Sequence, residues 1–250
     1  MPAYPLDGKP MYQLTRFGLR EMTECGAALR RLGAGVTSLE EVASEIVRFL
    51  YTHLIDEAGH PACALIRAFK THPAEHIGPA LQRFAAKKLG HELLSSSTKC
   101  FLLIASAGQE PDWNDRLRSK RFRAIPLEGE TFVAQFPMFS QLLTQFGVDL
   151  HTFLKPGSNL LVDQEEHRYN VFHVAEAVGS PYIPFQQEFV LPYHIQSVLG
   201  FGSLLPSGEI FAVILFSKVA IPREVADRFQ TLALCAKIAL LPFERDVAFS

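Results

Sequence analysis

Two histidines lie where an imidazole could do chemistry. His173 follows Phe172 in an apolar run, and His194 precedes a strand-like segment that contains Gly200 and Gly202. An imidazole in an apolar cleft can bind a metal or haem iron, hydrogen-bond a ligand, or transfer a proton. The alternative, which we favour, is a structural histidine whose ring only hydrogen-bonds its neighbours.

The remaining candidate groups lack a catalytic or metal-binding pattern. His72 and His76 share the i, i+4 spacing of a metal site on a helix, but Pro73 lies between them and favours a surface loop. Asp163 and the Glu165-Glu166-His167 run are typical of a solvated charged segment. Because the sequence has no nucleophile elbow, phosphate loop or HExxH motif, it favours a protein that is not an enzyme.

The four cysteines are predicted to be buried apolar residues. They lie far apart and form no CxxC pair, which argues against a zinc ribbon and, in a reducing compartment, against a disulfide framework. The four are Cys25, Cys63, Cys100 and Cys235.

A short basic cluster contains interleaved aromatic residues, a composition that can hold phosphates and stack bases. Its members are Trp113, Arg116, Arg118, Lys120, Arg121, Phe122 and Arg123. The whole chain is nearly neutral, with 24 Lys and Arg against 26 Asp and Glu, so no global field attracts nucleic acid. We therefore expect a solvated loop or a contact to an acidic protein.

The bulk composition predicts a single decorated domain. The chain has 250 residues, 48% of them hydrophobic, which is enough for a substantial core. It has no apolar run long enough for a membrane helix, and its first ten residues do not resemble a secretory signal, so we expect a cytoplasmic protein with no membrane partner. We expect an N-terminal extension at 1–18, one domain at 19–243 and a tail at 244–250.

Hydrophobic periodicity and turn residues predict the elements of this domain. Helices are expected over 19–32, 39–54 (with a capping box at Thr37 or Ser38), 77–89, 130–146 (with a kink at Pro137) and 222–243. Strands are expected over 62–69, 99–105, 124–127, 170–174, 197–204 and 210–216, with a turn at 205–208 and an irregular loop at 179–185.

The order of these elements resembles the GAF domain family of small-molecule sensors. The resemblance spans residues 20–243 and is carried by residues 192–202, 208–217 and 222–243. It implies an α+β fold with a central antiparallel sheet, N- and C-terminal helices on one face, and a ligand cavity under a loop-rich insertion (about residues 106–190) on the other. It also implies a sensory or regulatory role in signal transduction, with a separate output protein such as a kinase or regulator.

The resemblance places the candidate site on the sheet face that carries the insertion. The cavity would be lined by Phe172, His173, Tyr182, Phe185, Tyr193 and His194, with Phe201 on its floor, and Phe189 beside them. The ligand or cofactor is unspecified, with haem as one candidate. No Cys directly precedes a His, which is the arrangement of the bilin-binding members.

The glycine pair is expected on the other face, against the closing helix. Val198, Gly200, Gly202 and Leu204 share one side of their strand, so this side is nearly bare and something must approach it closely. The closing helix offers small residues for such an approach, Ala233, Ala236 and Ala239.

Terminal helices of this kind often form dimers. A homodimer is expected through the stripe Met22, Cys25, Leu29 and Leu32 and through the second apolar side of the closing helix, Leu234, Ile238 and Leu241. Two alternatives to the sensor remain, namely an interaction scaffold whose cavity is filled by its own aromatic residues, and an enzyme that uses His173 or His194.

Overall fold

The computed structural model describes residues 10–145, 148–154 and 171–245. The charged segment at 163–167 lies outside the described residues, as do residues 1–9 and 246–250 of the two expected terminal segments.

A six-stranded antiparallel sheet forms the centre of the molecule, in the order β5-β4-β3-β8-β7-β6. Its strands are β3 (Cys63–Pro73), β4 (Lys99–Gly108), β5 (Ala124–Leu127), β6 (Val171–Val174), β7 (Ser197–Leu204) and β8 (Ile210–Ser217). The two central strands, β3 and β8, are almost continuously buried because both faces of the sheet are covered.

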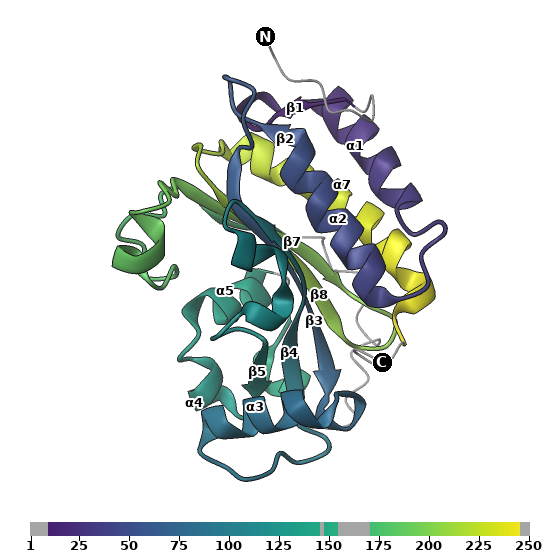
Figure 1. Cartoon of the computed structure of the whole chain (residues 1–250), viewed down its shortest axis with the longest axis vertical. Helices are drawn as coiled ribbons and strands as arrows, with labels where there is room; N and C mark the ends of the chain where they lie inside the picture. The colour runs from purple at the N-terminus through teal and green to yellow at the C-terminus, as the bar shows by residue number, and fades with distance from the viewer. Residues whose placement is uncertain (1–9, 146–147, 155–170, 246–250) are drawn as a thin grey trace.

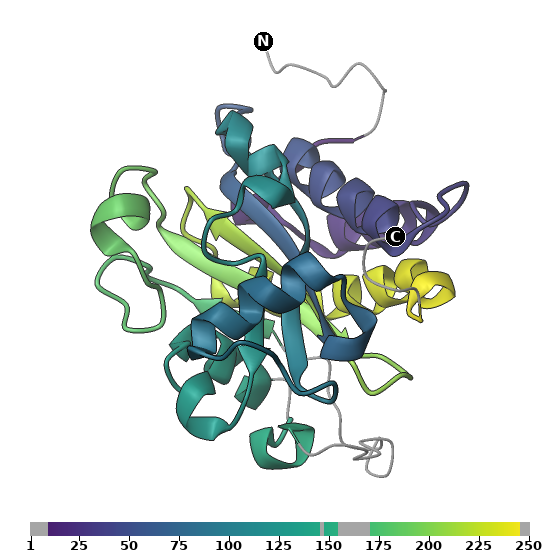
Figure 2. The same cartoon turned by 60° about the horizontal axis from the view of Figure 1, so that its bottom comes forward.

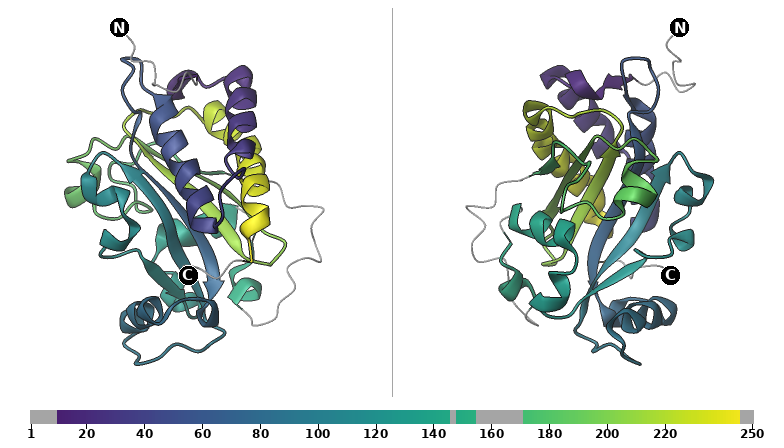
Figure 3. Two further views of the ribbon diagram at one scale, coloured as in Figure 1. Left: turned by 45° about the vertical axis from the view of Figure 1, so that its right-hand side comes forward. Right: turned by 90° about the vertical axis from the view of Figure 1, so that its left-hand side faces the viewer.

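Three helices from the two ends of the chain cover one face of the sheet (Figures 1 and 3). They are α1 (Leu19–Arg31), α2 (Leu39–His53) and α7 (Arg223–Leu240). Ser38 caps α2, since its Oγ accepts a hydrogen bond from the Glu41 amide (3.2 Å), which selects the second of the two predicted capping registers. The α+β architecture with terminal helices on one face is confirmed.

The domain begins before residue 19. The strand β1 (Tyr12–Gln13) pairs in parallel with β2 (Leu54–Ile55), and a 3-10 turn at Leu14–Arg16 follows it. The side chains of Tyr12, Leu14 and Phe17 are fully buried in the core between the helices and the sheet. Residues 10–18 are therefore part of the domain and not an extension of it.

Short helices and loops cover the opposite face of the sheet. They comprise α4 (Glu130–Val133), α5 (Pro137–Gln145), α6 (Leu150–Leu154) and a π-helical turn at Gln186–Val190. Pro137 does not kink one long helix; it begins a new one, at a position where proline is tolerated. Helix α3 (Pro79–Leu89) contacts β5, and it comes forward when the molecule is viewed toward that end (Figure 2).

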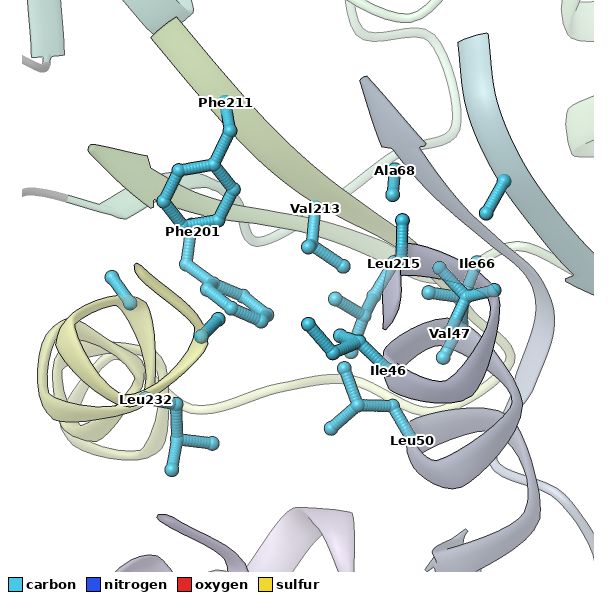
Figure 4. Packing of buried hydrophobic residues seen from close by; sticks show 14 of the residues in the cluster. Ile46, Val47, Leu50, Ile66, Ala68, Phe201, Phe211, Val213, Leu215 and Leu232 are labelled. Atoms are coloured by element: carbon cyan, nitrogen blue, oxygen red, sulfur yellow. The ribbon is translucent and has the colours of Figure 1, made fainter. Parts of the chain in front are cut away.

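The expected position of the glycine pair is wrong. Leu199 and Phe201 point toward the helices, as Figure 4 shows for Phe201, whose ring centroid lies 5.6 Å from that of Phe229 in α7. A Cβ on Gly200 would instead lie 3.3 Å from Phe172 and 3.6 Å from Leu142 on the insertion side. The small residues of α7 leave room for large rings from the sheet, whereas Gly200 leaves room for rings from the insertion side.

The cysteine prediction is confirmed, because all four cysteines are free and buried. Within the described ranges, no helix combines the length and apolar composition needed to cross a bilayer. The same ranges contain no group of three or more His, Cys, Asp or Glu side chains placed to hold a metal ion.

Candidate functional site

A cavity of about 520 Å³ lies on the sheet face opposite the terminal helices. Its floor is formed by side chains of the central strands β3, β4 and β8. These are Leu65, Arg67, Phe69, Phe101, Ile214 and Phe216. The walls come from residues 112–125, from 135–142 around the start of α5, and from 184–193, which lie far apart in the sequence.

One wall is a cluster of aromatic rings. The ring centroid of Trp113 lies 4.6 Å from that of Tyr193 and 5.6 Å from that of Phe189. Phe189 in turn contacts Phe216 of the floor edge to face, at 5.0 Å. Side chains of this kind present broad apolar faces against which a flat molecule can stack.

A second wall combines basic and aromatic side chains. The guanidinium carbon of Arg121 lies 4.4 Å from the ring centroid of Phe185, and Phe122 meets Phe185 edge to face at 5.9 Å. Lys120 and Arg118 line the same wall, and Arg118 pairs with Asp112 at 2.5 Å. The wall therefore places cations beside aromatic faces, an arrangement that favours anionic and aromatic ligands.

The remaining members of the basic cluster turn away from the cavity. Arg116 forms a bidentate ion pair with Glu40 of α2, in which its Nε donates to Oε1 (2.6 Å) and its Nη2 donates to Oε2 (3.0 Å). Arg123 lies over the ring of Phe84, 4.4 Å from its centroid. The cluster is thus not simply a solvated loop. Arg116 and Arg123 contact neighbouring elements, and Arg118, Lys120 and Arg121 supply three cations to the cavity.

Arg67 places a guanidinium on the floor. It lies on β3 between two apolar positions of the same face, 5.8 Å from the ring centroid of Phe122. Its Nε atom is buried and, within the described residues, has no hydrogen-bond partner. Burial lowers the pKa of Arg67 to about 10, so the group is still a cation at neutral pH.

Only part of the predicted site lines the cavity. Phe185 and Tyr193 do, and so does Phe189. Tyr182 is 39% exposed and His194 is exposed, with its backbone in the left-handed region at φ 54°.

The other three predicted residues are structural. Phe172 is fully buried beneath the insertion, against Gly200, and Phe201 belongs to the helix-side core. His173 points to the helix side because side chains alternate along β6; its Nε2 donates to the backbone oxygen of Ile221 (3.0 Å), and burial lowers its pKa. The favoured reading of His173 as a structural histidine agrees with this position.

The sequence contains local signals for some cavity residues that were not predicted as part of the site. Arg67 is the only charged residue in an otherwise apolar strand run, ACALIRAF, which marks a position facing something polar. Trp113 and Phe122 stood out within the basic cluster, but nothing local indicated that this loop folds back over β3. His173 and His194, the two candidate bases of the enzyme alternative, do not line the cavity.

No protein-family model matches the chain, and no curated protein matches its sequence. Among solved structures, the chain is similar to the crystal structure of the phycoerythrobilin-bound GAF domain from a cyanobacterial phytochrome. The two share 14% sequence identity, the match covers 88% of this chain and 94% of that chain, and the TM-score is 0.40. A likeness at this level says nothing about a ligand.

Proposed function

We propose that this chain is a sensory or regulatory domain that binds a small molecule in the cavity on the sheet. The observation that carries the proposal is the cavity itself, about 520 Å³ in volume and walled by aromatic and apolar side chains with a few cations. Both its size and its lining are typical of small-molecule sites. A ligand would act by stabilising one packing of the insertion over the sheet.

The distribution of packing supports a ligand over the scaffold alternative. At β6 and β7 the face is closely packed, with Phe172 and Leu142 against Gly200. Over β3, β4 and β8 the same layer leaves space between Phe69, Phe101 and the aromatic wall. A scaffold whose cavity is filled by its own aromatic side chains would not contain this space.

Ligand binding should raise thermal stability, and a bulkier side chain in the cavity should abolish the effect. With haem, nucleotides and aromatic acids as the panel, a compound present at about 100 times its Kd stabilises the protein by about 2.7 kcal/mol, or several degrees in Tm. Met138→Trp places a large ring in the cavity wall and should remove the shift, whereas Met22→Trp on α1 should keep it. The proposal fails if no compound shifts Tm, or if Met138→Trp responds like the unmodified protein.

We further propose that the domain signals as a homodimer through α7, to a separate output protein such as a kinase or regulator. The stripe predicted on α1 is occupied within the chain, since Cys25 and Leu29 are fully buried in the core shared with α7. The second side of α7 stays open: Leu234 and Ile238 are 39% and 41% exposed, and Leu241, directly after the end of α7, is 37% exposed. Three apolar residues spaced by one helical turn form a stripe suited to a partner helix.

Charged residues in this stripe should dissociate the dimer. Leu234→Glu with Ile238→Glu places two carboxylates in the proposed interface, where burial without a partner is costly. In sedimentation velocity at micromolar concentration we expect the unmodified chain as a dimer and the double variant as a monomer. Leu93→Glu, at a leucine that is 79% exposed in a loop outside α7, should remain dimeric. A monomeric unmodified chain would refute the dimer.

A further inference from the structure

We infer that the ligand of this cavity is an aromatic molecule carrying an anionic oxygen group, and that Arg67 binds that group. The inference rests on the proposed function and adds the chemical class of the ligand. It follows from three features of the described residues: the guanidinium of Arg67 on the floor, whose buried Nε atom has no hydrogen-bond partner, the surplus of cations around the cavity, and the aromatic rings on its two walls.

The charged side chain of Arg67 on the cavity floor costs free energy of folding. A charge removed from water destabilises a protein by several kcal/mol unless a counter-charge and hydrogen bonds replace the lost hydration. Within the described residues, no carboxylate forms an ion pair with Arg67, and its buried Nε donates to nothing. Stacking near Phe122 offsets only part of this cost. A bound carboxylate or phosphate would supply the missing acceptor, because a guanidinium binds such groups through two parallel hydrogen bonds.

The described lining of the cavity carries more positive than negative charge. Among the residues that the structure describes, four basic side chains face the cavity, namely Arg67, Arg118, Lys120 and Arg121, against two acidic ones, Asp112 and Glu188. Asp112 is already paired with Arg118. The cavity is thus cationic in a chain whose formal net charge is −2, so the cations are concentrated here.

Charged side chains and aromatic rings surround the same cavity. Arg67 projects from the sheet, whereas Lys120 and Arg121 come from the loop that lines the same cavity. Basic side chains therefore border the same cavity from two elements. Trp113 and Phe185 belong to separate walls and offer aromatic surface to the rest of the ligand. A neutral aromatic compound would leave Arg67 unpaired, and a small inorganic anion would leave the aromatic walls empty.

The test uses a matched pair of fluorescent probes and the single tryptophan of the chain. 8-Anilinonaphthalene-1-sulfonate carries an aromatic system and an anionic sulfonate, and N-phenyl-1-naphthylamine has the same rings without the charge. Trp113 is the only tryptophan in the sequence and lines the cavity, so quenching of its emission reports binding at this site. Titrations are made with the unmodified chain, with Arg67→Gln, and with Arg123→Gln as a control at a stacked arginine outside the lining.

Arg67→Gln is expected to weaken binding of the sulfonate probe by about tenfold or more, the size of one charge-assisted hydrogen-bonded pair. The uncharged probe should change by less than about twofold, as a contact to a neutral ring involves no such pair. Arg123→Gln should affect neither probe. On the unmodified chain, added salt should weaken the sulfonate probe alone, and this measurement needs no variant.

The outcomes separate this inference from the proposed function. In one outcome, the uncharged probe quenches Trp113 and the sulfonate probe binds no more tightly. In another, Arg67→Gln lowers the affinity for both probes equally. Either result means that the cavity binds ligands but that the inference of an anionic ligand is wrong. An unchanged affinity of the sulfonate probe in Arg67→Gln also overturns the inference. If neither probe quenches Trp113 in the unmodified chain, the proposed function fails with it.

Discussion

Replacement of Phe229 with alanine is expected to lower the free energy of unfolding by about 3–5 kcal/mol, the range for a fully buried phenylalanine. Phe229 lies at the centre of the helix-side core, with no exposed surface. Its ring centroid is 5.2 Å from that of Phe17 and 5.6 Å from that of Phe201, so it joins the N-terminal segment, α7 and the sheet. Removal of the ring leaves a cavity between these three elements, and we expect that they cannot all move inward to fill it.

Equilibrium unfolding in guanidinium chloride measures this effect, with the m-value checked for a common unfolding transition. Phe229→Leu retains most of the buried volume and should lower the free energy of unfolding clearly less than Phe229→Ala does. Phe132→Ala, at a partly exposed ring of α4 on the other side of the sheet, is the control and should cost least. If Phe229→Ala costs no more than Phe132→Ala, the core does not depend on this ring.

Acidification is expected to destabilise the protein largely through His72. The sequence favoured a surface loop for this residue, but it lies in β3 and is 2% exposed, so that expectation is wrong. Its Nε2 accepts a hydrogen bond from the ammonium of Lys70 (3.3 Å). Burial, and then the charge of Lys70, lower its pKa to about 3.

The sign follows from proton binding. An unfolded chain with a histidine pKa near 6.5 takes up a proton as pH falls below that value, whereas the folded chain does so only near pH 3. Stability contributed by the neutral ring is therefore present at neutral pH and is lost as pH falls between these two values. Between about pH 7.5 and about pH 4.5 this loss amounts to about 2–3 kcal/mol.

Denaturant unfolding at both pH values, with His72→Gln compared to the unmodified chain, isolates this contribution. The glutamine variant should lose about 2–3 kcal/mol less than the unmodified chain over the same interval. His76→Gln, at an exposed histidine four residues away, should behave like the unmodified chain. An equal loss in His72→Gln and the unmodified chain would show that this ring does not govern the acid response.

Most of the elements could be predicted because their signals are local. The apolar stripe of the first helix gave Leu19–Arg31 almost to the residue, and the run at 124–127 is β5 as expected. Gly208 has φ 80°, the positive value expected from the turn sequence at 205–208. Predicted strands fell short where tertiary pairing extends them, as in β3, which continues to Pro73 alongside β4.

The candidate site could be predicted only in part, because its residues meet through long-range contacts. Phe185 and Tyr193, which the resemblance predicted as ligand-binding residues, do line the cavity. Arg67 and Trp113 were not assigned to the cavity, although they are 46 residues apart in sequence and line the same space. No periodicity within either segment encodes that meeting.

The sequence by itself determined which residues share a side of each strand, and so grouped Gly200 with Gly202 and Phe201 with Leu199. Strand alternation fixes this grouping through backbone geometry alone. Only the tertiary structure decided which group faces the helices, because that choice depends on how the volumes of two packed layers fit. The rings of Phe201 and Phe229 fill the helix side, and Gly200 makes room for Phe172 on the other. The same packing of the insertion against the sheet leaves the cavity above Arg67 unfilled.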